Sequence, residues 1–386
     1  MKIAHEIMAL QPDLTAWRRH LHSQPELAYE EVKTAAFIAE QLASFGFEVH
    51  TGIGGTGVVG TLRAGTGGGA IGLRADMDAL PMQEAGDRPW RSQTPGVFHG
   101  CGHDGHMTML LGAARHLAAT RRFSGTVHAI FQPAEEGEGG AKAMIEDGLF
   151  ERFPCDVVYA IHNWPALPVG SLAVRPGAMM ASADQFDIVV RGKSGHAAMP
   201  HLCLDPIVVA AHLVTAAQAI VSRTTDPADA AVLSICQIHA GSAYNVIPDA
   251  VTLAGTARAL TVATRARLEA DLQRVCAGIA ATYGAEIELR WELGYPPTVN
   301  HAGPAATVAR VASGLFERVH TDLPATMGAE DFAFMLEARP GAYIWLGQDG
   351  GPHACGLHNT RYDFNDAVAP HGVALFTALV EDALPP

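Results

Sequence analysis

The sequence predicts an α/β protein in which a larger domain is interrupted by a smaller domain of βαββαβ order. The chain has 386 residues, of which 48% are hydrophobic, and this length exceeds what one ordinary core needs. Apolar strands alternate with helical segments up to about residue 183 and again after residue 294, as in α/β domains. The residues between them follow the order strand, helix, strand, strand, helix, strand. We therefore expect a discontinuous domain of residues 1–183 and 294–386, and an inserted domain of residues 184–293.

The first domain is expected to open with helices between residues 11 and 45, broken at Pro25, and then a strand at Phe47–His50. The glycine-rich stretch Thr51–Gly57 matches the pattern of dinucleotide-binding loops. That fingerprint requires a helix after the glycines, whereas the strand-like Val58–Arg63 follows here. We therefore expect a hairpin turn and no nucleotide site.

Three apolar strands of the first domain each end close to side chains that suit metal binding or proton transfer. The strands and the residues that follow them are Ala70–Asp76 with Asp78, Gly125–Phe131 with Glu135 and Glu136, and Val157–Ile161 with His162. Ligands of open α/β sheets bind at the carboxyl ends of the strands. The sequence therefore predicts a site along this edge of the sheet.

The inserted domain is predicted from alternating strands and two alanine-rich helices. Its expected elements are Gln185–Val190, helix Leu204–Val221, Ala231–His239, Ala250–Ala257, helix Leu260–Tyr283 and Glu286–Trp291. Asp205-Pro206 is a typical start of a helix. A sheet of this kind keeps an exposed face or edge, where self-association usually occurs.

The charge and cysteine content exclude several classes of protein. Acidic residues number 40 against 26 lysines and arginines, a net charge of -14, which argues against a nucleic-acid partner. We find no basic segment followed by an apolar run at the start, and no stretch of roughly 20 uninterrupted apolar residues, so we expect neither a signal peptide nor a membrane partner. Six scattered cysteines are typical of reduced thiols, and we expect a cytoplasmic protein.

The densest group of metal-binding side chains lies in Phe98–His106. Cys101 and His103 are two positions apart, a spacing that a turn can present to one ion and a helix face cannot. The intervening glycines allow such a turn. A thiolate and an imidazole suit zinc and other borderline transition metals.

The remaining ligand candidates each have a simpler interpretation. Glu135 and Glu136 could be solvated surface acids, and His162 and His358 could be hydrogen-bonded core histidines. Their occurrence together with the Cys101 loop favours a shared metal site, in which one carboxylate binds metal and the other accepts a proton from water.

Other histidines and polar loops stay open at this point. His99 and His106 could support the ligands or be structural, and His353 and Cys355 could accompany His358. In the inserted domain, three residues suit the binding of an oxyanion or a carboxylate: His196, Asn245 and Arg258.

The chain resembles the aminoacylase, hippurate hydrolase and indole-acetyl-amino-acid hydrolase family of dinuclear metallopeptidases. The motifs that carry the resemblance follow the family order: Gly72–Pro81, Gly100–His106, Gln132–Gly137, His162–Asn163, Ser194–His196, Asn245–Pro248, Met327–Phe332 and Leu357–Asn359. The resemblance implies a zinc-peptidase-like α/β catalytic domain and an inserted ferredoxin-like lid domain through which two subunits form a homodimer.

The resemblance also implies the site residues. Cys101 would bridge two divalent ions (zinc, manganese, cobalt or nickel), and the other ligands would be His103, Glu136, His162 and His358. Glu135 would be the general base and acid. His196 would reach the partner subunit's site to steady an oxyanion, and the substrate carboxylate would be held by Asn245 and Arg258.

Two positions select one branch of this family. Arg74 stands where many relatives have a metal-binding histidine, and Cys101 and His103 stand near their bridging aspartate. Both features are similar to the hippurate hydrolase branch, in which Asp76 would support a ligand.

The resemblance implies metal-dependent hydrolysis of the amide bond of N-acyl amino acids, which releases an amino acid and a carboxylic acid. Two alternatives remain, a dipeptidase of the same fold and a non-catalytic metal-binding dimer. Presence of both Glu135 and Glu136 favours an enzyme.

Overall fold

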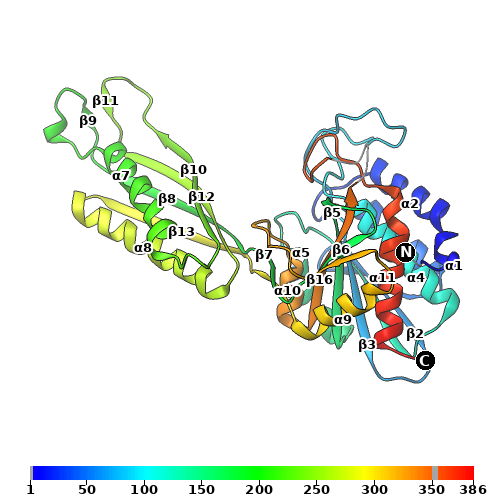
Figure 1. Ribbon diagram of the computed structural model, residues 1–386. Helices are drawn as coiled ribbons and strands as arrows, with labels where there is room; N and C mark the ends of the chain where they lie inside the picture. The colour runs from blue at the N-terminus through cyan, green and yellow to red at the C-terminus, as the bar shows by residue number, and fades with distance from the viewer. Residues whose placement is uncertain (1–2, 350–354) are drawn as a thin grey trace. The chain divides into compact units, whose positions relative to one another are not determined.

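The computed structural model describes residues 3–349 and 355–386, so His353 lies outside the described residues. The chain forms two compact units (Figure 1). Unit 1 contains Met1–Met179, Val299–Pro324 and Asp331–Pro386, and unit 2 contains Met180–Thr298 and Ala325–Glu330. That unit 1 is a catalytic domain and unit 2 a lid stays a prediction at this point.

Unit 1 is built on an eight-stranded mixed sheet. In their order across the sheet, the strands are β1 (Glu48–Ile53), β2 (Gly57–Ala64), β4 (Gly125–Gln132), β3 (Ala70–Asp76), β5 (Val157–Pro168), β16 (Gly341–Asp349), β6 (Ser171–Ala173) and β15 (Arg318–His320). Strands β4, β3, β5 and β16 run parallel to one another. Their carboxyl ends therefore meet at one edge, as the sequence predicted.

The glycine-rich stretch after β1 is the turn of a hairpin. Gly54 and Gly55 have positive φ values of 61° and 104°, and β2 pairs antiparallel with β1 directly after them. A strand and not a helix follows the glycines, so the dinucleotide interpretation is excluded for this stretch.

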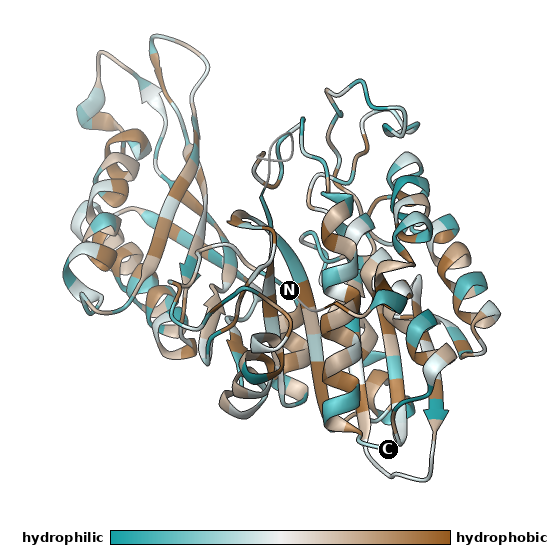
Figure 2. Ribbon diagram, turned by 45° about the vertical axis from the view of Figure 1, so that its right-hand side comes forward, coloured by the Kyte–Doolittle hydropathy of each residue, from teal (hydrophilic) through white to brown (hydrophobic). Residues whose placement is uncertain are grey.

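Helices cover the sheet of unit 1. They are α1 (His5–Met8), α2 (Gln11–Ser23), α3 (Val32–Ser44), α4 (His103–Thr120), α5 (Gly140–Glu146), α6 (Leu149–Arg152), α9 (Ala302–Ser313), α10 (Phe332–Ala338) and α11 (Ala369–Ala383), with a short 3₁₀ turn at Asp366–Val368. Figure 2 shows hydrophobic residues along the strands that these helices cover. Both faces of parallel strands must be buried in this way.

Helix α4 is the central helix of unit 1, because it is apolar on nearly every side and packs against α2, α11 and β3. Gly112 lies where α2 and α11 approach closest. A Cβ at this position would lie 2.6 Å from Leu14 Cδ2 and 2.6 Å from Val373 Cγ2. This packing fixes the start of α4, which carries His103.

Unit 2 contains the predicted βαββαβ fold. Its elements are β8 (Ala183–Arg191), α7 (Pro206–Ala219), β10 (Ala231–Ala240), β12 (Ala250–Ala259), α8 (Val262–Tyr283) and β13 (Glu286–Tyr295). The sheet order is β10-β12-β8-β13, and all pairs are antiparallel. The fold class predicted from the sequence is confirmed.

Shorter pieces complete unit 2. The two-residue strands β9 (Gly195–His196) and β11 (Val246–Ile247) pair with each other, with a 3₁₀ turn at Pro200–Leu202. A π-helical turn, Ile220–Thr224, extends α7. The joined segment Pro206–Thr224 is long and apolar enough to cross a membrane by length and composition, a test that core helices of globular proteins also pass. Strand β14 (Thr298–Asn300) pairs with β7 (Gly177–Met180).

Candidate metal centre

Cys101 and His103 lie on a tight turn at the start of α4. Gly102 between them has φ of 93°, a left-handed conformation that favours glycine, and His103 is the first residue of the helix. Both side chains are buried. His103 Nδ1 donates to the carbonyl oxygen of Asp78 at 2.8 Å, and His103 Nε2 has no hydrogen-bond partner among the described residues. Burial alone would lower the pKa of His103, but Asp76 and Asp78 outweigh it and raise the pKa to about 10, so a metal ion that binds this nitrogen would replace its proton.

His162 lies within β5, which does not end at Ile161 as the sequence predicted but continues to Pro168 in its pairing with β16, and its second nitrogen faces Cys101. Its Nδ1 donates to the carbonyl oxygen of Asn163 at 2.7 Å, and its Nε2 lies 3.5 Å from Cys101 Sγ. Burial, reinforced by neighbouring His106, lowers the pKa of His162 well below its usual value. The imidazole is therefore neutral at pH 7, the form that binds metal.

The Cys101 thiol is protonated in the absence of an ion. Burial, together with the carboxylates Glu136 and Glu135, raises its pKa well above the usual value. A divalent cation reverses this balance, because a coordinated thiol loses its proton. The carboxylate charges and the thiol sulfur therefore both favour the binding of a cation beside Cys101.

Glu135 and Glu136 follow β4 after a strained turn. Ala134 has φ of 53°, unusual for a residue with a side chain, and the buried carboxylate of Glu31 accepts its amide hydrogen at 2.9 Å. The amide of Glu136 donates to Asp78 Oδ2 at 2.9 Å. Glu31 and Asp78 therefore set the path of the chain that carries both glutamates.

His358 reaches the same cluster from the C-terminal part of the chain. Its φ is 57°, and its amide donates to the carbonyl oxygen of Gly100 at 2.9 Å. Its Nε2 lies 3.1 Å from Glu136 Oε1, a contact that raises the pKa of His358. Although its side chain is about half exposed, at 53%, its backbone is anchored to the Cys101 turn.

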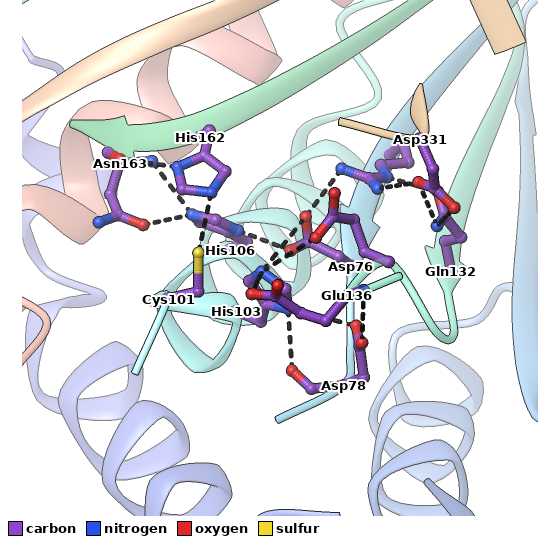
Figure 3. Close-up of polar contacts among 12 residues, drawn as sticks. Asp76, Asp78, Cys101, His103, His106, Gln132, Glu136, His162, Asn163 and Asp331 are labelled. Carbon is purple, nitrogen blue, oxygen red and sulfur yellow. Dashed lines mark hydrogen bonds and ion pairs between the residues drawn. The ribbon is translucent and has the colours of Figure 1, made fainter. Parts of the chain in front are cut away.

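The structure brings six predicted residues of unit 1 into overlapping groups, whose ligand atoms all lie within 4.8 Å of one another in each group. Figure 3 shows four of them, Cys101, His103, Glu136 and His162. These groups are Cys101–His103–His162, Cys101–Glu136–His358 and His103–Glu135–Glu136. Cys101 and His103 each belong to two of these groups. Sulfur, imidazole and carboxylate donors of this kind suit borderline divalent metals.

The other three predicted residues lie in unit 2. His196 and Asn245 are neighbours on the β9–β11 pair, where the amide of Ala197 donates to the carbonyl oxygen of Asn245 at 3.0 Å. Arg258 lies near the end of β12, where it is paired with Val232 of β10. Within unit 2, the structure brings His196 and Asn245 together and leaves Arg258 apart.

Several functional neighbours were not recognised from the sequence. His106, left open above, hydrogen-bonds through both ring nitrogens, to Asp76 Oδ1 at 2.6 Å and Asn163 Oδ1 at 2.5 Å. Asp78 orients His103 and the amide of Glu136. The signals in the sequence were the position of Asp78 just after β3 and the place of His106 in the histidine-rich stretch Phe98–His106. His99 is buried, and burial lowers its pKa to about 4, but it does not join the groups that could hold an ion.

Arg74 supports the centre as a buried cation. It donates to Asp76 Oδ2 at 2.8 Å, Gln132 Oε1 at 2.7 Å and Asp331 Oδ1 at 3.1 Å (Figure 3). Burial opposes ionisation of Asp76, but His103, His106 and Arg74 outweigh it and hold its pKa well below the usual range. Asp76 is therefore an anion that orients His106.

Several known proteins are similar to this chain in sequence and in fold. Residues 72–382 match the family described as Peptidase family M20/M25/M40. A hippurate hydrolase of Campylobacter jejuni is 42% identical over 381 residues, 98% of each chain. An N-acetyl-L-cysteine deacetylase of Bacillus subtilis is 38% identical over 89% of this chain and 82% of its own. A solved Bacillus subtilis structure, a dinuclear metal-binding peptidase of the M20 family, is 33% identical with a TM-score of 0.86 over 98% of this chain and 99% of its own.

Proposed function

The chain belongs to the M20/M25/M40 family of metal-dependent hydrolases, and from this membership we propose that it hydrolyses the amide bond of N-acyl amino acids. The products are a free amino acid and a carboxylic acid. Hippurate and N-acetylcysteine, named for two relatives, are both amino acids with an acylated nitrogen. The observation that carries the proposal is the convergence of Cys101, His103, Glu136, His162 and His358 in overlapping groups, with the buried carboxylate of Glu135 beside His103 and Glu136.

Two divalent ions fit this donor set. His103 Nε2 is buried without a hydrogen-bond partner among the described residues, and His162 Nε2 faces the Cys101 sulfur. We assign the ligands as Cys101, shared by both ions, with His103, Glu136, His162 and His358. Zinc, manganese, cobalt and nickel all accept these donors. When bound, the ions supply Lewis acidity that polarises the acyl carbonyl and lowers the pKa of water.

Glu135 is the proton carrier in this proposal. It is buried beside the donor set but belongs to a different group from Cys101 and His162. As general base it accepts the proton of the attacking water, and as general acid it donates that proton to the departing amine nitrogen. The two adjacent glutamates therefore have different roles in this proposal. Glu135 transfers protons, and Glu136, whose carboxylate contacts His358, binds metal.

Arg258 is proposed to bind the substrate carboxylate. Its guanidinium lines a cavity of about 250 Å³ on unit 2 together with Gln185 and Thr256. It has no hydrogen-bond or ion-pair partner in the described part of the chain, and burial lowers its pKa. A half-buried guanidinium without a hydrogen-bond partner in the described part of the chain fits an anionic ligand, although the nearby Asp184 carboxylate opposes the effect of burial on its pKa.

His196 is proposed to act in the partner subunit's site. Arg258 lies eight positions along β12 from Ala250. Ala250 is paired with Arg191, which lies just before the loop that carries His196. At about 3.3 Å per residue, His196 and Arg258 lie on the order of 25 Å apart along one sheet. One unit 2 therefore cannot present both side chains to a single small substrate, whereas two subunits can, and Asn245 accompanies His196.

Unit 2 also carries the surface that we propose for the homodimer. Large apolar side chains are exposed around the β9–β11 pair and the start of α7: Met199, Leu202, Ile207, Val208, Ile238, Tyr244 and Val246. Exposed apolar groups of this number mark an interaction surface. All six cysteines are unpaired, which supports the proposed cytoplasmic location.

The test is release of amino acid from acylated substrates by the purified protein. Hippurate, N-acetylmethionine and a dipeptide with a free amino terminus are compared in the presence of manganese or zinc. We expect turnover of acylated substrates that a chelator abolishes and added metal restores. Exclusive turnover of the dipeptide would instead establish the dipeptidase alternative, and no turnover with two bound ions would establish a non-catalytic dimer.

A further inference from the structure

A network of buried hydrogen bonds lies next to the proposed ligands. It runs from Asp76 through His106 to Asn163, whose Nδ2 donates to the Tyr362 hydroxyl at 2.7 Å, and the hydroxyl donates to Gln348 Oε1 at 3.2 Å. Figure 3 shows its first part, with His106 between Asp76 and Asn163. All five side chains are at most 1% exposed. None of them is a proposed ligand or proton carrier.

Asn163 connects this hydrogen-bond network to His162. Its carbonyl oxygen accepts the hydrogen of His162 Nδ1 at 2.7 Å, and its side-chain Oδ1 accepts a hydrogen bond from His106 Nε2 at 2.5 Å. The rings of His106 and His162 also contact each other, with centroids 4.5 Å apart. The position of Asn163 therefore determines where His162 Nε2 points.

Tyr362 connects the same hydrogen-bond network to the Cys101 turn. A Cβ on Gly102 would collide with Asn163 Oδ1 and with the Tyr362 hydroxyl, so these two groups form the floor of the turn. Tyr362 also follows His358 closely in the chain, and its amide donates to the carbonyl oxygen of Asn359 at 2.8 Å. The Tyr362 side chain thus contacts the supports of two proposed ligands, Cys101 and His162, and its backbone is hydrogen-bonded to the residue that follows His358.

We propose that Tyr362 is a positioning residue whose hydroxyl holds Asn163 and the Gly102 turn, so that Cys101 Sγ and His162 Nε2 point at the same ion. The inference rests on the proposed ligand set. Burial raises the pKa of Tyr362 well above its usual value, so the hydroxyl keeps its proton and both of its hydrogen bonds. Phenylalanine would fill the same space and would leave Asn163 Nδ2 without this acceptor.

The test is the metal affinity of Tyr362→Phe in the full-length protein, measured by competition with a chelator. We expect zinc or cobalt to bind about 10- to 100-fold more weakly. The cobalt–thiolate absorption of Cys101 should weaken or shift. Activity should return towards the wild-type kcat with excess metal at unchanged KM, because Tyr362 does not touch substrate. Tyr159→Phe is the matched control, because Tyr159 is a buried tyrosine of β5 that does not belong to this hydrogen-bond network.

The outcomes separate this inference from the proposed function. If Cys101→Ala and His162→Ala lose metal and Tyr362→Phe binds it like Tyr159→Phe, the positioning role is wrong and the ligand set stands. If Cys101→Ala and His162→Ala keep wild-type affinity, the ligand set itself is wrong. Should Tyr362→Phe fail to fold, Gln348→Leu is the second variant, because it removes the acceptor of the hydroxyl. Unchanged affinity and an unchanged cobalt spectrum in Gln348→Leu would then overturn the proposal.

Discussion

Single histidines around the centre differ in how many of their nitrogen atoms are already used. His103 donates through Nδ1 and keeps Nε2 without a partner among the described residues, whereas both nitrogens of His106 hydrogen-bond. The two residues lie one turn apart on α4. Their hydrogen bonds, and not their spacing, therefore assign His103 to the metal and His106 to the support of Asn163.

His22 forms a buried pair with Asp104, with His22 Nδ1 2.7 Å from Asp104 Oδ2. Burial alone would lower its pKa, but hydrogen bonds to Asp104 and Glu84 outweigh burial and raise the pKa to about 9. The native state thus binds this proton more tightly than the unfolded chain. The resulting stability is fully present below about pH 6.5 and is lost as the pH rises through about 9.

We therefore predict that the free energy of unfolding of the metal-free protein falls by roughly 3 kcal/mol more in wild type than in His22→Gln between pH 6.5 and 9.5. Urea denaturation at a series of pH values measures this difference in slope. Parallel pH profiles for the two proteins would contradict the assigned protonation of His22.

The types of residues at the centre could be predicted from the sequence, but their supporting contacts could not. Cys101, Glu136 and His162 were recognisable because metal-binding side chains follow strands or a glycine turn. Partners such as Tyr362 and Asn163 are 199 positions apart in the chain, and neither residue type is unusual alone. Such contacts arise only when the folded chain brings distant segments together.

At the scale of elements, the start of α4 is the most constrained turn. The sequence predicted a turn that presents Cys101 and His103, and in the structure helix α4 begins at His103 itself. Strand positions were predictable because buried strands have continuous apolar runs. The helix start was less clear, because Gly102 ends the turn with no side chain to cap the helix.

We predict that Gly102→Ala weakens metal binding, because the added Cβ would displace Asn163 and Tyr362. Gly46→Ala is the matched control: Gly46 has a similar φ of 86°, and nothing lies within 4 Å of its added Cβ. The control should lose about 1–2 kcal/mol of stability from backbone strain alone and keep its metal affinity.

For both glycine variants, thermal unfolding measures the stability lost through backbone strain, and chelator competition measures the metal affinity lost through crowding by the added Cβ. Equal metal affinities in Gly102→Ala and Gly46→Ala would show that the close approach to Asn163 and Tyr362 does not shape the centre.

At the scale of the whole molecule, the insertion of unit 2 was predictable because its βαββαβ order differs from the surrounding sequence. The return of Ala325–Glu330 to unit 2 was not predictable, because this segment contains no helix or strand of its own. It joins unit 2 by backbone hydrogen bonds from the Ala181 amide to the carbonyl oxygens of Thr326 and Gly328, at 3.1 and 2.9 Å.

The proposed sharing of sites between subunits predicts complementation. Glu135→Gln and His196→Ala proteins should each be nearly inactive. When the two are unfolded, mixed in equal amounts and refolded together, half of the dimers are mixed, and each has one complete site. Activity should then recover to about a quarter of the wild-type level. No recovery in mixed dimers of verified composition would place His196 in its own subunit's site or outside catalysis.

The most direct test of the central claim measures metal content and turnover together in Glu135→Gln. Glutamine keeps the size of the side chain but cannot carry a proton, and Glu135 is not among the assigned ligands. We predict two bound ions per subunit, as in wild type, with hippurate or N-acetylmethionine turnover lower by several orders of magnitude. Substantial turnover with both ions bound would contradict the role of Glu135, and loss of the ions would contradict the division of labour between Glu135 and Glu136.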